Sequence, residues 1–184
     1  MMRSFWPALL IVTAFGASAP GVAAATCDAS SFVSGAGSAF LSAARAGTPG
    51  AFAGAASRYA DLHGIAMFAL GPHRKLLKSS REAEYVSLTR SFIGRFMADN
   101  SSKLASNAMT VTDCTGDKSA MIVSTKLSSG KKLIFKIYKT KGGYRVRDVN
   151  VSSVWLAQQL RSKFTGVISR NNGDIDALFD YLRK

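Results

Sequence analysis

The apolar residues of this chain change their spacing twice, and this change limits the folds that the chain can adopt. Segments 108–114, 118–127, 131–139 and 144–151 alternate apolar and polar residues, which is the two-residue period of a β-strand. Short glycine-containing turns separate the last three segments at hairpin spacing. Apolar residues before and after the four segments recur at helical spacing. The sequence therefore predicts an α+β protein in which N-terminal and C-terminal helices cover a four-stranded antiparallel sheet.

Several helices are predicted before the sheet. Residues 30–46 carry apolar residues at helical spacing, and a second helix begins at Pro49 and runs towards Tyr59. Asp61 is predicted to cap a short apolar helix that ends at Gly71-Pro72.

The longest helix is predicted to follow a capping box. Ser79 stands three residues before Glu82, a spacing in which each side chain can bond the backbone N–H of the other. The helix is expected to end near Asn100.

Helices return at about Val154 and continue to the C-terminus, with an interruption at Asn171-Asn172-Gly173. One stripe of the first C-terminal helix is apolar, and we expect it to close the sheet face from the C-terminal side. The stripe consists of Leu160, Phe164, Val167 and Ile168.

The first residues have the pattern of a secretory signal peptide. Arg3 supplies a positive charge, residues 5–15 are mostly apolar, and Ala23-Ala24-Ala25 offers small residues for cleavage. We therefore predict a signal peptide over residues 1–25, a single domain over residues 26–184 and export to the periplasm.

The composition is strongly basic. The chain carries 24 Lys and Arg residues against 11 Asp and Glu residues, a formal net charge of +13. A charge of this size favours anionic partners such as lipid headgroups, anionic surfaces or nucleic acid, although a basic surface also simply aids solubility. Because an exported protein meets an oxidising compartment, Cys27 and Cys114 are candidate partners in a disulfide.

Familiar catalytic motifs are missing from the sequence. It has no Gly-x-Ser-x-Gly, no glycine-rich phosphate loop, and no metal-ligand spacing at His63 or His73. Asp148 is the one strand carboxylate that would suit an isomerase-like enzyme on a cone-shaped α+β scaffold. Tyr138 and Tyr144 lie among basic residues, which favours a nucleic-acid-binding module only weakly. We expect a protein that is not an enzyme, holds no metal and binds no nucleic acid.

Five stretches, in this order and spacing, resemble one known family. They are 58–71 (Arg-Tyr-Ala-Asp-Leu-His-Gly-Ile-Ala-Met-Phe-Ala-Leu-Gly), the capped helix start at 79–82, 147–151 (Arg-Asp-Val-Asn-Val), 161–164 (Arg-Ser-Lys-Phe) and 173–178 (Gly-Asp-Ile-Asp-Ala-Leu). Nearly all of the chain after residue 25 is similar to the MlaC-type, or toluene-tolerance, periplasmic phospholipid-binding proteins.

The resemblance implies a soluble, monomeric carrier with a deep apolar cavity and no cofactor. Such a carrier shuttles glycerophospholipid between the outer membrane and an inner-membrane ABC transporter with an MCE-type ring. Its partners would be that transporter and an outer-membrane lipoprotein complex. The sequence departs from the usual family pattern at Pro72-His73-Arg74-Lys75 and at Val154-Trp155-Leu156. Another lipid, such as a hopanoid, therefore remains an alternative cargo.

A lipid carrier has to replace the bilayer around two acyl chains. Because each buried methylene is worth about 0.8 kcal/mol, roughly thirty of them amount to over about 20 kcal/mol. We predict that one wall of the cavity comes from the sheet and the other from helices. The predicted wall residues are Met121, Val123, Leu133, Phe135 and Ile137 on strands and Ile65, Phe68, Phe92, Phe96 and Phe164 on helices.

Overall fold

The computed structural model describes residues 27–117 and 119–184, so the predicted signal peptide lies outside the described residues. In chain order the elements are α1 (Ser30–Ala46), α2 (Pro49–Tyr59), α3 (Leu62–Leu70), the 3-10 segments η1 (Gly71–Leu76) and η2 (Ser79–Arg81), α4 (Glu82–Asp99), the 3-10 segment η3 (Ser101–Lys103), β1 (Met109–Asp117), β2 (Ala120–Leu127), β3 (Lys132–Thr140), β4 (Gly143–Val151), β5 (Val154–Trp155), α5 (Leu156–Arg170) and α6 (Asp176–Arg183). None of the helices in these residues combines the length and the apolar character that crossing a bilayer requires.

The strands form one antiparallel sheet in the order β1-β2-β3-β4-β5, and the predicted α+β class is confirmed. The sheet has five strands rather than four. The extra strand, β5, pairs with the end of β4 through Asn150 and Val151. Ser152 and Ser153 make the turn between them with positive φ angles of 51° and 69°. The sequence does not predict β5, because a two-residue strand is too short to show alternation and serine seldom adopts positive φ.

Side-chain caps fix the starts of α2 and α3, and the sequence predicts both the start at Pro49 and the cap by Asp61. Thr48 accepts a hydrogen bond from the Ala51 N–H at 3.3 Å, with Pro49 at the first helical position. Asp61 accepts one from the Gly64 N–H at 2.9 Å. In each case the oxygen satisfies an N–H group that the first helical turn leaves unpaired.

The predicted capping box before α4 is wrong. Residues 79–81 form the 3-10 turn η2, so α4 begins at Glu82 itself and has no side-chain cap. Glu82 is therefore the first residue of the helix instead of the third, and its carboxylate reaches across to His63 at 2.7 Å.

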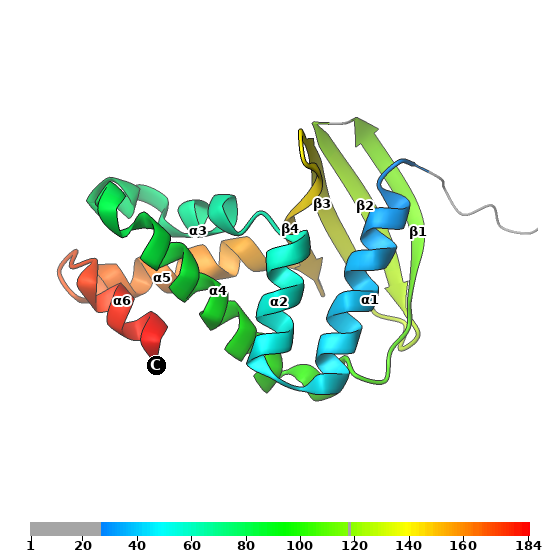
Figure 1. The fold of residues 1–184 in the computed structure, drawn as a ribbon, viewed down its shortest axis with the longest axis horizontal. Coiled ribbons are helices and arrows are strands. Elements are labelled where there is room, and N and C mark those ends of the chain that lie inside the picture. The colour runs from blue at the N-terminus through cyan, green and yellow to red at the C-terminus, as the bar shows by residue number, and fades with distance from the viewer. Residues whose placement is uncertain (1–26, 118) are drawn as a thin grey trace, which may run out of the picture.

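A first hydrophobic core lies between α1 and one face of the sheet, which we call the inner face. Its buried side chains are Ala29, Val33, Val111, Met121, Val123, Phe135, Ile137 and Val146. A disulfide between Cys27 and Cys114 joins the residues just before α1 to β1. Figure 1 shows α1 and α2 lying over the sheet on one side.

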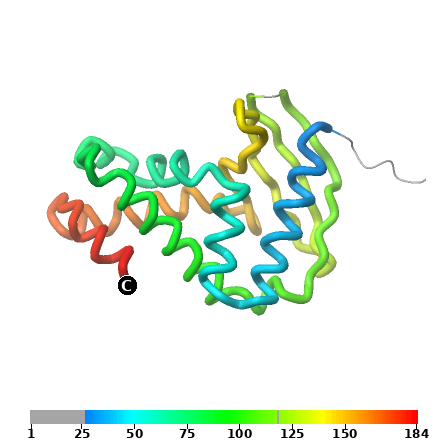
Figure 2. The backbone as a smooth tube through the Cα atoms, in the orientation of Figure 1, coloured from blue at the N-terminus to red at the C-terminus, as the bar shows by residue number. Residues whose placement is uncertain are grey.

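A second core lies among α3, α4, α5 and α6, which together form the helical lobe. Its buried side chains are Ala66, Met67, Ala69, Leu70, Tyr85, Phe164, Val167, Ile168, Leu178, Phe179 and Leu182. The expectation that the α5 stripe closes the sheet face is therefore wrong. Figure 2 shows α5 running away from the sheet to the far end of the lobe. Its apolar stripe therefore packs with residues of α3 and α6.

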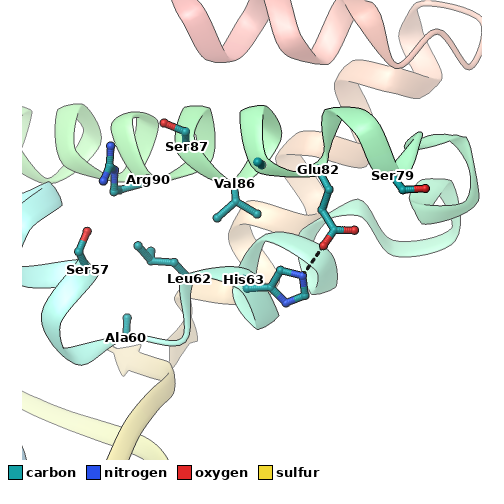
Figure 3. A pocket seen from close by; sticks show the side chains of 10 residues that line it. Ser57, Ala60, Leu62, His63, Ser79, Glu82, Val86, Ser87 and Arg90 are labelled. Carbon is teal, nitrogen blue, oxygen red and sulfur yellow. Dashed lines mark hydrogen bonds and ion pairs between the residues drawn. The ribbon is translucent and has the colours of Figure 1, made fainter. Parts of the chain in front are cut away.

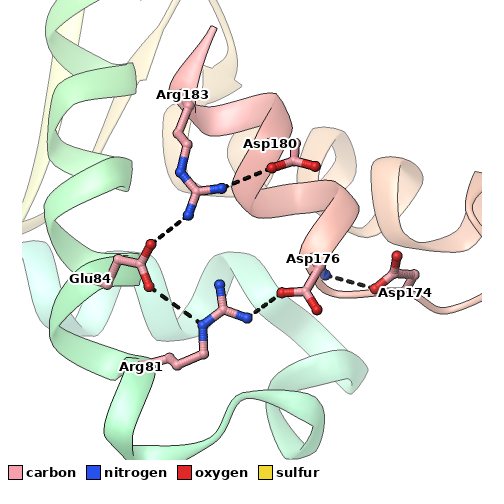
Figure 4. Close-up of polar contacts among 6 residues, drawn as sticks. All are labelled: Arg81, Glu84, Asp174, Asp176, Asp180 and Arg183. Atoms are coloured by element: carbon pink, nitrogen blue, oxygen red, sulfur yellow. Dashed lines mark hydrogen bonds and ion pairs between the residues drawn. The ribbon is translucent and has the colours of Figure 1, made fainter.

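Ion pairs fasten α6 to the start of α4 on the surface of the helical lobe (Figure 4). Glu84 accepts hydrogen bonds from Arg81 and from Arg183, the latter at 2.6 Å. Arg81 also bonds Asp176, and Arg183 bonds Asp180 at 2.8 Å. The hydrogen bond from Arg81 lowers the pKa of Asp176 below its usual value. The carboxylates of Glu84, Asp176 and Asp180 are therefore all neutralised by these two arginines.

Removal of the disulfide should destabilise the fold. The two cysteines are 87 residues apart, and a cross-link over a loop of that length is worth about 4 kcal/mol in the chain-entropy treatment. We expect the C27S/C114S double variant to lose about 2–4 kcal/mol of unfolding free energy in urea titrations. A reducing agent should destabilise the wild type and leave the double variant unchanged. Equal stability of both proteins under oxidising conditions would contradict this role.

Candidate functional site

The five predicted wall residues on strands all lie on the inner face of the sheet. Met121 stands opposite Ile137, and Val123 stands opposite Phe135, in the β2–β3 register. These four side chains are buried in the core beneath α1, whereas Leu133 is only half-buried. The alternation of apolar and polar residues therefore placed these side chains on the correct face of the sheet. Most of them pack against α1, however, and do not border an open cavity.

The five predicted wall residues on helices do not form a single wall. Phe92 and Phe164 contact each other edge-to-face in the helical lobe, with ring centroids 5.6 Å apart. Ile65 is half-buried on α3. Phe68 and Phe96 point outward, with 42% and 47% of their surface exposed. The structure thus places Phe164 and Phe92 in a helix core and leaves the other two phenylalanines largely uncovered.

Two further apolar residues extend the inner face where it is least covered. Val149 stands opposite Phe135 and Val151 stands opposite Leu133, and both valines are half-buried. Side chains of directly opposed residues share a face, so Leu133, Val149 and Val151 form one patch, which we call the open end of the inner face. The alternation of residues 144–151 indicated that Val149 and Val151 share a face. Only the register between β3 and β4 shows that they lie beside Phe135 and Leu133.

An open groove of about 680 Å³ runs between the α2–α3 junction and α4. Leu62 and Val86 provide apolar surface in it, and the His63–Glu82 pair bridges its walls at one end. Figure 3 shows Arg90 on the α4 side, at a distance from that pair. None of the ten predicted wall residues lines this groove.

A second open groove, of about 670 Å³, lies beside the disulfide. Of the ten predicted wall residues, only Met121 lines it, together with Cys27, Asp117 and Tyr144. The Tyr144 hydroxyl is buried without a hydrogen-bond partner, and its ring packs against Phe32 with centroids 5.8 Å apart. Neither groove joins the sheet wall to the helix wall that the sequence predicted.

Asp148, the candidate base, is occupied by the backbone. Its Oδ1 accepts hydrogen bonds from the N–H groups of Val149 at 2.8 Å and Ala157 at 2.9 Å. Ala157 lies in the first turn of α5, so Asp148 caps that helix from the neighbouring strand. Its carboxylate therefore anchors α5 to the sheet.

Other titratable groups also have structural partners. His63 pairs with Glu82, and no cluster of three His, Cys, Asp or Glu side chains suited to a metal ion occurs in residues 27–117 and 119–184. On the outer face of the sheet, the Tyr138 hydroxyl donates to Asp61 at 2.7 Å, and Arg147 lies 4.2 Å over its ring. Partial burial, together with Asp61, raises the pKa of Tyr138.

The arrangement of tyrosines does not favour a nucleic-acid-stacking platform. Tyr138 stands opposite Arg145 and Tyr144 opposite Lys139, so successive pairs place the two tyrosines on opposite faces. Tyr138 faces outward against Asp61, whereas Tyr144 packs inward on Phe32. Bases could not stack on both rings along one strand of nucleic acid.

Comparisons with known proteins give one family and one similar fold. A family model described as MlaC protein matches residues 42–184, well over half of the chain. Among solved structures, the chain is similar to a phospholipid-binding protein from Ralstonia solanacearum in complex with a phospholipid. The two share 19% sequence identity and a TM-score of 0.72, over 85% of this chain and 96% of that one. A search of curated proteins finds no match.

The capping role of Asp148 can be tested by substitution. Asp148→Ala removes the acceptor for the Ala157 N–H, so we expect a loss of about 1–2 kcal/mol in unfolding free energy measured by urea titration. Asp148→Asn keeps an acceptor oxygen and should lose clearly less. If both variants proved as stable as the wild type, the carboxylate would not be needed to hold α5.

Proposed function

This chain belongs to the MlaC family, and from that membership we propose that it binds phospholipid and carries it through the periplasm. The single observation that carries the proposal is that this fold matches a protein solved with a phospholipid bound. The match of the chain itself to the MlaC family model supports it. The signal-peptide pattern of residues 1–25 supports the periplasmic location.

We place the acyl chains at the open end of the inner face. Leu133, Val149 and Val151 keep apolar surface there although each pairs within a sheet. Phe96, on α4, is the most exposed large apolar side chain of the described residues. An exposed phenylalanine gains from cover by hydrocarbon, because burying its surface is worth about 1.5–3 kcal/mol.

The buried members of the predicted walls take a supporting role in this proposal. Met121, Val123, Phe135 and Ile137 form the floor beneath the open end and hold α1 to the sheet. A charged substitution at any of these positions would destabilise the fold, because the side chains lie in a packed core, and its effect on lipid binding could then not be separated from unfolding. Variants at half-exposed and exposed positions are the sharper probes.

We further propose that cargo passes between an outer-membrane lipoprotein complex and an inner-membrane ABC transporter with an MCE-type ring. Binding and release need no covalent step, cofactor or nucleotide in this chain. The capping role of Asp148 supports a carrier over an isomerase-like enzyme, since its oxygen is already committed to two backbone N–H groups. A hopanoid or another lipid remains the alternative cargo that the first experiment below distinguishes.

Protein purified from its native periplasm should contain lipid. Moving two acyl chains from an apolar site into water costs over about 20 kcal/mol of free energy. We therefore expect bound phospholipid to stay with the protein during purification. Mass spectrometry of an organic extract should detect glycerophospholipid well above the level in a control exported protein. Hopanoid in its place would identify the alternative cargo. An extract without any lipid above the control would contradict the carrier proposal.

A charge at Phe96 should expel the cargo without unfolding the protein. Phe96→Lys replaces an exposed apolar side chain, and a buried ammonium beside acyl chains carries a desolvation penalty of several kcal/mol. We expect co-purified lipid to fall at least about fivefold, as a loss of 1 kcal/mol already implies. Leu76→Lys is the matched control, since Leu76 is 38% exposed on η1, at the far end of the helical lobe from the sheet (Figure 1). Equal lipid content in the two variants would remove Phe96 from the lipid site.

A further inference from the structure

The segment that joins α3 to α4 is basic and contains no carboxylate. No Asp or Glu occurs between Asp61 and Glu82. Within this stretch Arg74, Lys75 and Lys78 are all exposed. Positive charge in the segment is therefore not offset by any acidic residue of the segment itself.

The start of α5 adds a further cation to this segment. A Cβ atom on Gly71 would lie 3.0 Å from Arg161 Nε, so α5 packs directly on the beginning of η1. The guanidinium of Arg161 lies 5.1 Å over the ring of Phe68. The chain between Asp148 and Asp174, which includes all of α5, also has no acidic residue.

Several carboxylates of the helical lobe are already paired with basic side chains. Figure 4 shows those of Glu84, Asp176 and Asp180 bound to Arg81 and Arg183 at the junction of α4 and α6.

Glu82 is likewise paired, with His63. Among the residues that the structure describes, Arg74, Lys75 and Arg161 form no ion pair. Lys78 is different, because it lies near enough to Asp176 to help lower the pKa of that carboxyl.

Exposed apolar side chains stand among these cations. Phe68 is 42% exposed and Leu76 is 38% exposed, two of the four large apolar side chains that the described residues leave open. We call Phe68, Arg74, Lys75, Leu76 and Arg161 the tip. Figure 1 shows the connection from α3 to α4 at the end of the helical lobe farthest from the sheet.

We propose that the tip docks on the surface of an anionic lipid bilayer. Phe68 and Leu76 enter the headgroup layer, and Arg74, Lys75 and Arg161 contact lipid phosphates. The combination of projecting apolar side chains with unpaired cations is the chemistry that binds a membrane interface. An acidic protein would need the cations but not the projecting leucine and phenylalanine. The tip is separate from the proposed lipid site at the open end of the inner face, so each proposal can fail alone.

Vesicle binding tests the proposal directly. The purified full-length protein is sedimented with vesicles of phosphatidylcholine alone, or with vesicles in which about one-third of the lipid is phosphatidylglycerol. We expect binding to the anionic vesicles that weakens with added salt, and little binding to the neutral ones. A wild type that does not bind anionic vesicles would overturn the proposal and point to an acidic protein partner.

Charge-reversal variants locate the contact. Each basic residue at an anionic surface contributes about fivefold in affinity, so R74E/K75E should bind at least about tenfold more weakly. The control K131E/K132E makes the same change in net charge at two exposed residues, one just before β3 and one at its start, and should bind within about twofold of wild type. Equal weakening in both variants would overturn the proposal, because net charge alone would then explain binding.

Apolar variants test entry into the headgroup layer. Leu76→Ser should weaken binding to anionic vesicles by about threefold or more, whereas Val154→Ser, a change at a similarly exposed residue, should not. Equal binding by the two serine variants would overturn the proposed entry of Leu76. Co-purified lipid should be unchanged in R74E/K75E, which separates docking from cargo binding. Loss of cargo in that variant would contradict a separate docking surface.

Discussion

Hydrogen bonds from β4 join the core beneath α1 to the core of the helical lobe. The Asp61 N–H donates to the Val146 carbonyl at 2.9 Å, which fixes the start of α3 against the sheet. Two residues further along the strand, Asp148 accepts a hydrogen bond from the Ala157 N–H and fixes the start of α5. Both helices run from the sheet into the helical lobe. One strand therefore holds two helices of the lobe at their N-termini, and α4 of the lobe also packs against α1 and α2 through Met97 and Ala98.

This arrangement explains why apolar surface stays open between well-packed parts. The core beneath α1 and the core among α3 to α6 are each closely packed, and their buried side chains contact one another within the same core. Leu133 and Val149 belong to the edge of the first core and remain half-buried, and Phe96 lies outside the second. A protein that binds hydrocarbon needs such uncovered surface next to rigid support, because a fully filled core offers no room for acyl chains.

The distribution of charge follows the same division. Glu84, Asp176 and Asp180 lie where α4 meets α6 and pair with Arg81 and Arg183. The opposite side of the lobe, from η1 to α5, keeps its cations unpaired. A net charge of +13 is therefore not spread evenly, and the unpaired part coincides with exposed Phe68 and Leu76.

Local patterns in the sequence determined the main helices, the four long strands and the face of each of these strands, since spacing along one element depends only on backbone geometry. They placed Met121, Val123, Phe135 and Ile137 on one face, and the structure agrees. They failed where the outcome depends on distant residues. Only the tertiary structure decided that the α5 stripe meets α6 instead of the sheet and that Asp148 caps a helix. Both depend on the direction in which α5 leaves β5, and no apolar period encodes that direction.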